Sequence, residues 1–276
     1  MNYLALQIRR LLWCLLPLVL ILAAIPAIAG PVDCGSTPIR VGQFKLGYRY
    51  YVENGEEKGI NKDIVEELRK RTGCRFVTQE MSFARIWADL ASGDLDMSIS
   101  GIRSPERDKS LWCASTIASK NYTVIRTALS AKIHSAEDFM SNEKLQFGVV
   151  RGYTHGVELD RWLETARKEN RVEESASVDV LFEKLKAGRI DAIFSFPFVY
   201  RKILLDQKME GDFVIQDWAP KDKGIIGCIM LNKNRFSENE AKRWQALVRK
   251  IHDDGTLKRI FNRYLPPHET EKLVDF

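Results

Sequence analysis

Two stretches carry the same kinds of residue in the same order: Leu90-Ala-Ser-Gly-Asp-Leu-Asp-Met-Ser-Ile-Ser100 and Leu185-Lys-Ala-Gly-Arg-Ile-Asp-Ala-Ile-Phe-Ser195. Each stretch follows apolar residues at i, i+3, i+4 and i+7, the spacing of one buried helix face. Each places a glycine where a helix can end in the left-handed conformation, before a short apolar strand. The chain therefore repeats one helix–turn–strand unit about 95 positions apart, which predicts two similar lobes. Two facing α/β lobes form a cleft, and clefts bind small molecules.

Strand and helix signals alternate around both copies. In the first half, a strand at residues 39–42 precedes a helix that Asn61 can cap and Gly73 can end, and a second strand follows at residues 74–77. The second half starts the same series at residue 145. This alternation predicts the α/β class, with a mainly parallel sheet flanked by helices in each lobe.

Two connecting stretches predict that the chain passes twice between the lobes. Residues 121–126 form an extended run that leaves the first lobe, and a strand at residues 225–231 returns to it. We therefore expect residues 36–124 and 223–276 to form lobe 1 and residues 129–222 to form lobe 2. Two connections of this kind are typical of hinged lobes that close on a ligand.

The first 29 residues resemble a secretory signal peptide. Arg9 and Arg10 precede an apolar run over residues 11–25, and small residues at 27–29 suit a signal peptidase. We expect cleavage and a secreted mature protein; an uncleaved membrane anchor is the alternative. The charges are nearly balanced, with 42 Lys and Arg against 37 Asp and Glu, and no long basic run indicates a nucleic-acid partner.

Four cysteines remain after the leader, an even number in a chain bound for an oxidising compartment. No Cys-x-x-Cys pair supports a zinc or thioredoxin-like site. Cys34 and Cys74 each precede a predicted strand, and neighbouring parallel strands bring their starts together. We therefore favour a Cys34–Cys74 bridge, which leaves Cys113 and Cys228 as the second pair. Buried free thiols are the alternative.

Several further segments, in their order and spacing, resemble family 3 of the bacterial extracellular solute-binding proteins, which serve ABC importers. The most specific are Gly59-Ile-Asn-Lys-Asp-Ile-Val-Glu-Glu-Leu68, Ser104-Pro-Glu-Arg107 and Asp254-Gly-Thr-Leu-Lys-Arg-Ile260, beside the two repeat units. The resemblance implies a periplasmic-binding-protein-like fold of two lobes joined by two crossing strands. It also implies a small-molecule ligand and a membrane ABC permease as partners. We expect a monomer without metal or cofactor.

The resemblance places the ligand between the lobes. Arg107 matches the family arginine that grips the ligand carboxylate, a task that suits the planar guanidinium. Ser100 and Gly101 precede it at the carboxyl end of a strand, where ligands of open α/β sheets bind. In the second lobe, Thr154 and its neighbour Arg151 lie at a strand-to-helix loop that can bind an anion. A role for Thr154 as a helix cap alone is the alternative.

Three aromatic residues are candidates for walling or stacking on the ligand, with core packing as the alternative: Tyr48, Tyr50 and Phe83. The second repeat departs from the family pattern at Phe196. Amino-acid binders usually carry an aspartate there, which pairs with the ligand's α-ammonium, and an unpaired ammonium in a closed cleft is costly. Arg103 beside Arg107 would place two arginines near one cleft. An amino acid stays the first expectation for the ligand, and both departures add an organic acid or another anionic solute as candidates.

We therefore expect a non-enzymatic binding protein that delivers a small polar or anionic solute to a permease. One alternative is an enzyme on the same scaffold, similar to the prephenate or arogenate dehydratases, which need a proton donor in the cleft. The candidates for that role are Glu80 and His155. The other alternative is a ligand-sensing module, because related domains lie outside membrane kinases.

Overall fold

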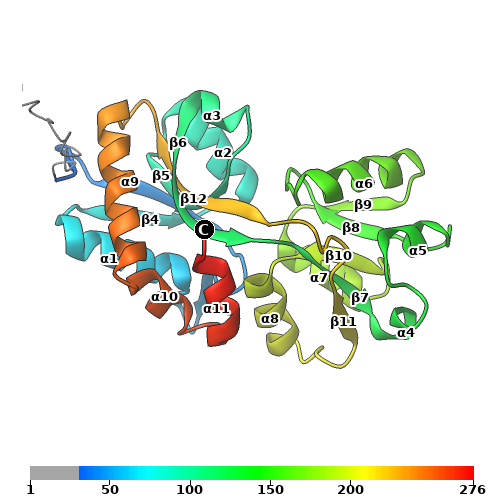
Figure 1. Cartoon of the computed structure of the whole chain (residues 1–276). Helices are drawn as coiled ribbons and strands as arrows, with labels where there is room; N and C mark the ends of the chain where they lie inside the picture. Colours follow the sequence, from blue (N-terminus) through cyan, green and yellow to red (C-terminus); the bar gives the residue numbers. More distant parts are fainter. Residues whose placement is uncertain (1–30) are drawn as a thin grey trace, which may run out of the picture.

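The computed structural model describes residues 31–276, so the predicted signal peptide lies outside the described residues. Two lobes, each built on a five-stranded sheet, lie beside one another and are joined by extended segments (Figure 1). Within residues 31–276, no helix combines the length and the apolar character that crossing a bilayer requires. The predicted two-lobed α/β fold is confirmed.

The first sheet has the strand order β4-β1-β5-β12-β6. Its strands are β1 (Ile39–Gln43), β4 (Phe76–Glu80), β5 (Met97–Ile102), β6 (Leu111–Ser119) and β12 (Ile225–Asn232). A small hairpin and six helices belong to this lobe: β2 (Tyr51–Glu53), β3 (Glu56–Lys58), α1 (Ile60–Thr72), α2 (Phe83–Ser92), α3 (Arg107–Ser110), α9 (Glu238–Asp253), α10 (Thr256–Phe261) and α11 (Pro267–Val274). Only β12 runs antiparallel to its neighbours, so the sheet is mainly parallel in direction.

The second sheet has the order β11-β7-β10-β8-β9. Its strands are β7 (Tyr122–Arg126), β8 (Phe147–Val150), β9 (Val172–Ser175), β10 (Ala192–Ser195) and β11 (Phe213–Gln216). Its helices are α4 (Thr127–Ser130), α5 (Ala136–Met140), α6 (Val157–Lys168), α7 (Val178–Lys186) and α8 (Pro197–Asp206). Here β7 is the one antiparallel strand. Both sheets thus contain a single reversed strand.

The repeated unit forms as the sequence predicts. Helix α2 ends at Gly93, whose φ of 92° is left-handed, and the chain enters β5. After α7 the chain turns at Gly188, with a φ of 68°, and enters β10. The apolar faces of both helices are buried, including Ile86, Leu90, Leu181, Phe182 and Leu185. The repeat therefore supplies one inner strand to each sheet.

Asn61 does not cap its helix, contrary to the sequence prediction. Gly59 occupies the N-cap position with a φ of 117°, and no side chain caps the helix there. Asn61 lies inside α1 and is buried. Its amide donates to Gln43 Oε1 at 3.0 Å and lies 3.0 Å from Ser100 Oγ. The asparagine therefore ties the helix to the first sheet near the end of β5.

The two connections between the lobes follow the predicted course. Strand β6 of the first sheet continues through residues 120–121 into β7 of the second, and β12 returns after β11. Figure 1 shows these green and yellow segments running between the lobes. Strand β6 was not predicted, because no distinctive motif marks residues 111–119, whose buried and half-buried side chains do not alternate strictly. The crossing segments are thus continuations of sheet strands.

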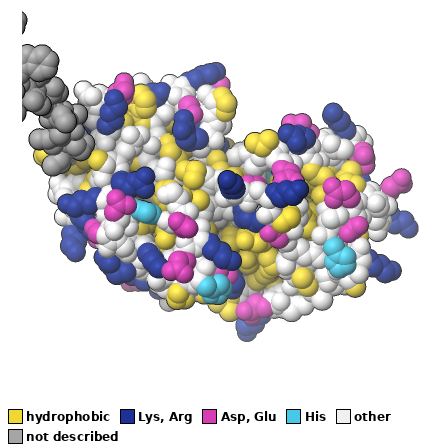
Figure 2. Space-filling view, in the orientation of Figure 1, with side chains coloured by type: hydrophobic (Ala, Val, Ile, Leu, Met, Phe, Trp, Pro, Cys, Tyr) yellow, Lys and Arg dark blue, Asp and Glu magenta, His cyan; other side chains and the backbone are white. Residues whose placement is uncertain are grey.

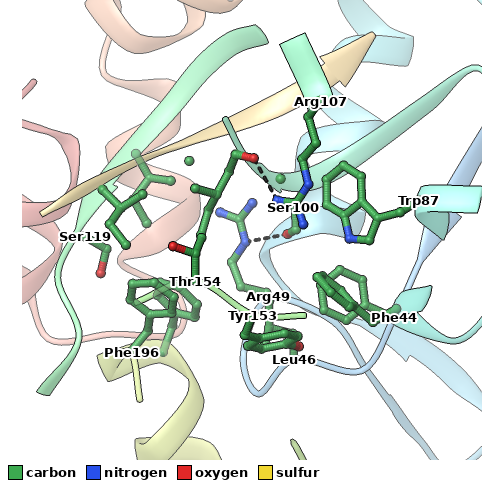
Figure 3. Close-up of a pocket in the computed structure, with 17 residues that line it drawn as sticks. Phe44, Leu46, Arg49, Trp87, Ser100, Arg107, Ser119, Tyr153, Thr154 and Phe196 are labelled. Atoms are coloured by element: carbon green, nitrogen blue, oxygen red, sulfur yellow. Dashed lines mark hydrogen bonds between the residues drawn. The ribbon is translucent and has the colours of Figure 1, made fainter. Parts of the chain in front are cut away.

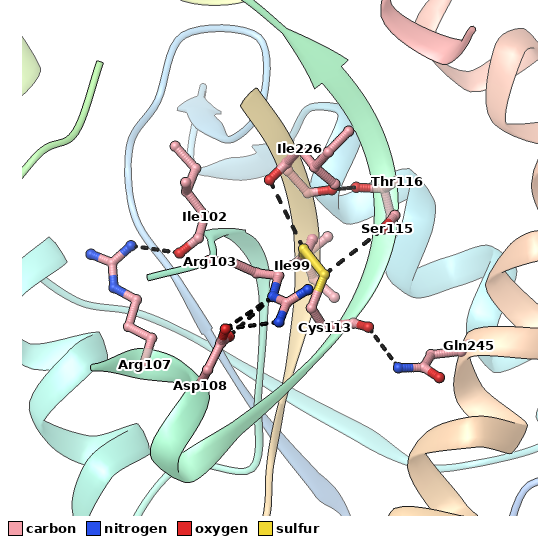
Figure 4. The surroundings of a disulfide bond; sticks show 12 residues. Ile99, Ile102, Arg103, Arg107, Asp108, Cys113, Ser115, Thr116, Ile226 and Gln245 are labelled. Carbon is pink, nitrogen blue, oxygen red and sulfur yellow. Dashed lines mark hydrogen bonds and ion pairs between the residues drawn. A yellow bond between two sulfur atoms is a disulfide. The ribbon is translucent and has the colours of Figure 1, made fainter. Parts of the chain in front are cut away.

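The predicted cysteine pairing is confirmed. Cys34 and Cys74 form one disulfide, and Cys113 and Cys228 form the other. The second bridge links β6 to β12, the two strands that continue toward the other lobe (Figure 4). It therefore fixes these strands to one another within the first lobe.

Candidate ligand-binding site

A cavity of about 70 Å³ lies between the two lobes. That volume is several times the roughly 10–15 Å³ that one water molecule needs, so the cavity suits a small molecule. The first lobe contributes residues of the loop after β1 and of α2, β5, α3, β6 and β12. The second lobe contributes Tyr153, Thr154, Phe196 and Phe198. Figure 2 shows the outer surface notched between the lobes.

The cavity brings together six of the nine predicted ligand residues: Phe83, Ser100, Gly101, Arg107, Thr154 and Phe196. Ser100 and Gly101 lie in β5, and Arg107 begins α3. Gly101 has no room for a side chain, because a Cβ there would lie 2.3 Å from Met230 Cγ. The end of the repeat unit therefore forms one wall, although contact with a ligand stays a prediction for all six residues.

Tyr48 and Tyr50 lie outside the cavity wall, unlike the prediction. Tyr48 is half-buried and packs on Tyr51 and Tyr264, with ring centroids 6.4 and 6.1 Å away. Tyr50 is buried, and its hydroxyl donates to Glu57 Oε1 at 2.9 Å. Both tyrosines therefore stabilise the first lobe, which is the core-packing alternative.

Arg151 also lies outside the cavity wall. Its side chain is 75% exposed, and its Nε lies 3.1 Å from Glu174 Oε2. Thr154 lines the cavity, but it precedes the helix start by three residues, because Gly156 is the N-cap of α6. Its hydroxyl donates to Asp160 in the first turn of α6. Thr154 is thus held by the helix start without capping it.

Arg107 is anchored by one hydrogen bond and one aromatic face. Its Nη1 donates to the carbonyl oxygen of Ile102 at 2.8 Å. The guanidinium carbon lies 3.6 Å from the ring centroid of Trp87, close enough for a cation–π contact. Burial lowers the pKa of Arg107 to about 10, so the group stays protonated at neutral pH. Among residues 31–276, no carboxylate pairs with this charge at the cavity.

Arg49 is a second cavity arginine, and the sequence analysis missed it. It is 2% exposed, and burial lowers its pKa to about 9. Its Nε donates to Ser100 Oγ at 3.0 Å, and its Nη2 donates to the carbonyl oxygen of Ile99 at 2.8 Å. Figure 3 shows Arg49 and Arg107 extending toward the same cavity from different elements. The only signal in the sequence is an arginine between two tyrosines that were themselves predicted to line the cleft.

Arg103 does not supply the second positive charge that the sequence analysis assigned to it. Its side chain is 61% exposed and forms an ion pair with Asp108 at 2.8 Å, as Figure 4 shows. It is absent from the cavity wall. Two arginines do line one cavity, as expected, but the second is Arg49 and not Arg103.

Aromatic and aliphatic side chains form most of the remaining wall. The Phe83 ring lies 5.2 Å from Phe44 and 5.7 Å from Trp87, as measured between centroids. It also meets Tyr153 of the second lobe at 4.5 Å. Phe196 stacks on Phe198 with a centroid distance of 5.2 Å. These rings line the same cavity as the two guanidinium groups, and apolar surroundings strengthen electrostatic interactions.

The lobes also meet through their backbones beside the cavity. The N–H of Tyr48 donates to the carbonyl oxygen of Phe198 at 2.7 Å. Gly47 precedes it with a φ of 53°, and a Cβ there would lie 2.3 Å from that carbonyl oxygen and 2.5 Å from Val199 Cα. Glycine at position 47 is therefore required for this approach of the lobes.

Gly47→Ala is expected to weaken ligand binding by about tenfold or more. The added methyl group opposes the approach of the lobes, and a protein whose closed state is disfavoured by about 1.4 kcal/mol binds its ligand about ten times more weakly. Calorimetric titration and the radius of gyration in solution measure the effect, and the variant should be the more open. Gly55→Ala is the matched control: its φ is 78°, yet nothing lies within 4 Å of the added Cβ. Equal losses in both variants would contradict a role for the lobe contact.

The chain matches a protein family along most of its length. The family described as "Bacterial extracellular solute-binding proteins, family 3" matches residues 46–267. The arginine-binding extracellular protein ArtP of Bacillus subtilis (strain 168) is 24% identical over 221 residues, which cover 78% of this chain and 80% of that protein. A probable histidine-binding protein of Neisseria gonorrhoeae is 20% identical over 212 residues, covering 76% of this chain and 75% of that protein.

Solved structures share the fold. An ancestral arginine-binding protein bound to arginine superposes with a TM-score of 0.68 at 20% identity. The superposition covers 83% of this chain and 98% of that protein. At this level of identity the likeness establishes the two-lobed architecture alone, so the ligand of this chain has to be argued from its own cavity.

Proposed function

Because this chain belongs to the bacterial extracellular solute-binding proteins, family 3, we propose that it captures a small carboxylate-bearing solute between its lobes. That solute is an amino acid or an organic acid. The observation that carries the proposal is Arg107, a half-buried guanidinium at the interlobe cavity with a hydrogen bond to Ile102 and no carboxylate partner among the described residues. A carboxylate fits the free edge of such a group with paired hydrogen bonds.

The bound solute is delivered to the membrane permease of an ABC importer. Residues 36–124 with 223–276 act as one lobe and residues 129–222 as the other, and closure around the solute presents a single shape to the permease. The basic and apolar leader at residues 1–29 supports export and a periplasmic location. The protein works as a monomer in this scheme.

Binding without catalysis is the function that the cavity favours. The two residues considered as proton donors, Glu80 and His155, do not line it. His155 is buried, and its backbone N–H and ring Nδ1 both lie near Asp160 Oδ1, at 2.9 and 3.2 Å. An enzyme would need a donor in reach of the substrate.

A thermal-shift screen of amino acids and organic acids tests the proposal. A solute present at 100 times its dissociation constant stabilises the protein by about 2.7 kcal/mol, which corresponds to a rise in Tm of about 5–10 °C in a chain of this size. The panel includes arginine and histidine, which the similar proteins are named for. If no amino acid or organic acid raises the Tm, the proposal is wrong.

A further inference from the structure

Arg49 is a buried cation whose hydrogen bonds are incomplete. Its Nε and Nη2 have acceptors, but Nη1 is buried and has no hydrogen-bond partner among the described residues. Arg49 lines the interlobe cavity, and its guanidinium carbon lies 5.8 Å from the ring centroid of Phe198 and 5.8 Å from that of Phe261. No carboxylate contributes to its pKa, which burial alone lowers. A buried charge without a counter-charge is costly, so a purely structural role does not account for it.

Arg171 shows how this chain satisfies an arginine that is structural. It is 3% exposed, comparable to Arg49, but it lies in the second lobe away from the cavity. Its three nitrogens donate to the backbone carbonyls of Leu145, Met140, Phe139 and Asn142, at 2.7–3.2 Å. Arg49 instead keeps one whole nitrogen unpaired at a cavity, which is the arrangement expected of a ligand-binding group.

The cavity contains positive charge and hydrogen-bond donors but no acid. Among its 17 lining residues, two are arginines and none is Asp or Glu. The indole Nε1 of Trp87 is a second buried donor that finds no acceptor in the described part of the chain. Thr154, which lines the cavity, donates to Asp160 Oδ2, and Asp160 Oδ1 accepts from the backbone N–H of His155, so this carboxylate is already paired. An incoming ammonium would meet two cations and no free carboxylate.

We infer that the cavity binds an organic carboxylate that has an apolar body and no ammonium group, with Arg49 as a second counter-charge beside Arg107. The inference rests on the proposed function. The carboxylate oxygens accept from Arg107 and from the unpaired Nη1 of Arg49, while Phe83, Tyr153 and Phe196 surround the apolar body. Phe196, at the position where the family usually carries an aspartate, covers the ligand without attracting an ammonium. The ligand class thus differs from the cationic amino acids that the similar proteins are named for.

Matched pairs of amino acids and their deaminated analogues test the inference by calorimetric titration. The pairs are L-phenylalanine with 3-phenylpropionate, L-leucine with 4-methylpentanoate, and L-glutamate with glutarate; L-arginine is added alone. Within at least one pair, the deaminated member is expected to have a dissociation constant about tenfold lower, or lower still, than that of the amino acid. The amino acid brings an unpaired ammonium into a closed site. An amino acid that binds as tightly as its analogue, or L-arginine as the best ligand, overturns the inference and leaves the solute-binding function standing. Binding of no member overturns the inference, whereas the solute-binding function fails only if the wider thermal-shift panel gives no ligand either.

Two variants separate the role of Arg49 from structural support. Arg49→Met should reduce the preference for the deaminated member by about tenfold or more, because it removes the charge. Arg49→Lys should retain most of the preference, because lysine keeps the charge although it lacks the forked donors. In urea unfolding without ligand, Arg49→Met should be as stable as the parent or more stable, whereas Arg171→Met, which orphans several buried carbonyls, should be clearly less stable. If Arg49→Met prefers the deaminated member as strongly as the parent does, the inference is overturned. If Arg49→Met does not fold, Arg49→Lys decides, and its loss of that preference overturns the inference.

Discussion

Arg107→Met is expected to weaken binding of the best carboxylate from the screen by about 30-fold to several thousand-fold. Removing one partner of a buried, hydrogen-bonded charge pair costs about 2–5 kcal/mol, because the other charge is left desolvated. Methionine keeps an apolar chain against Trp87, which the guanidinium now covers at 3.6 Å. The unliganded protein should therefore unfold close to the parent's midpoint. Titration calorimetry and urea unfolding give the two quantities on the same samples.

Arg103→Met is the matched control, because it removes the same charge from the same segment. Arg103 is exposed and already paired with Asp108, so its loss should change affinity by less than about threefold, the range of a surface ion pair. If both variants bind as tightly as the parent, or both lose affinity equally, Arg107 does not hold the carboxylate directly.

Replacing both Cys113 and Cys228 by serine is expected to lower the free energy of unfolding by about 2–5 kcal/mol. The bridge spans 115 positions in sequence, and long closed loops lose the most entropy in the unfolded chain. It also joins β6 to β12, so its loss loosens the strands that lead into both crossings. Urea unfolding of the oxidised parent and the double variant measures the difference.

The Cys34 and Cys74 pair provides the comparison. That bridge closes a separation of only 40 positions, so the corresponding double serine variant should lose somewhat less stability. A loss below 1 kcal/mol in the Cys113 and Cys228 variant would contradict the entropic account. A larger loss in the Cys34 and Cys74 variant would show that local packing outweighs loop length.

The two-lobed architecture could be predicted because local signals repeat. Gly93 and Gly188 each stop a helix in a conformation that favours glycine, and the following strands are short and apolar. These features depend on neighbours in sequence, which a single chain displays. The disulfide pairing followed from two other strands, since Cys34 and Cys74 lie near the starts of β1 and β4, which are adjacent and parallel.

The site could be predicted only where a motif marked it. Arg107 belongs to a recognisable segment, whereas Arg49 lies in an aromatic loop without one. Its environment comes from Ser100 and Ile99 on β5 and from Phe198 in the second lobe, about 50 and 150 positions away. Tyr48 and Tyr50 were selected for their chemistry, but their rings pack within the first lobe. Which member of a loop faces a cavity is decided by tertiary contacts.

The placement of β12 has a consequence for the order in which the protein is made. The second sheet uses strands from one continuous stretch, residues 122–216, so it has all its strands soon after that stretch emerges. The first sheet waits for residues 225–232, because β12 lies between β5 and β6. During that interval two strand edges and the Cys113 thiol lack their partners, and such edges are prone to mispairing. The lobe that is synthesised first is therefore the one that is completed last.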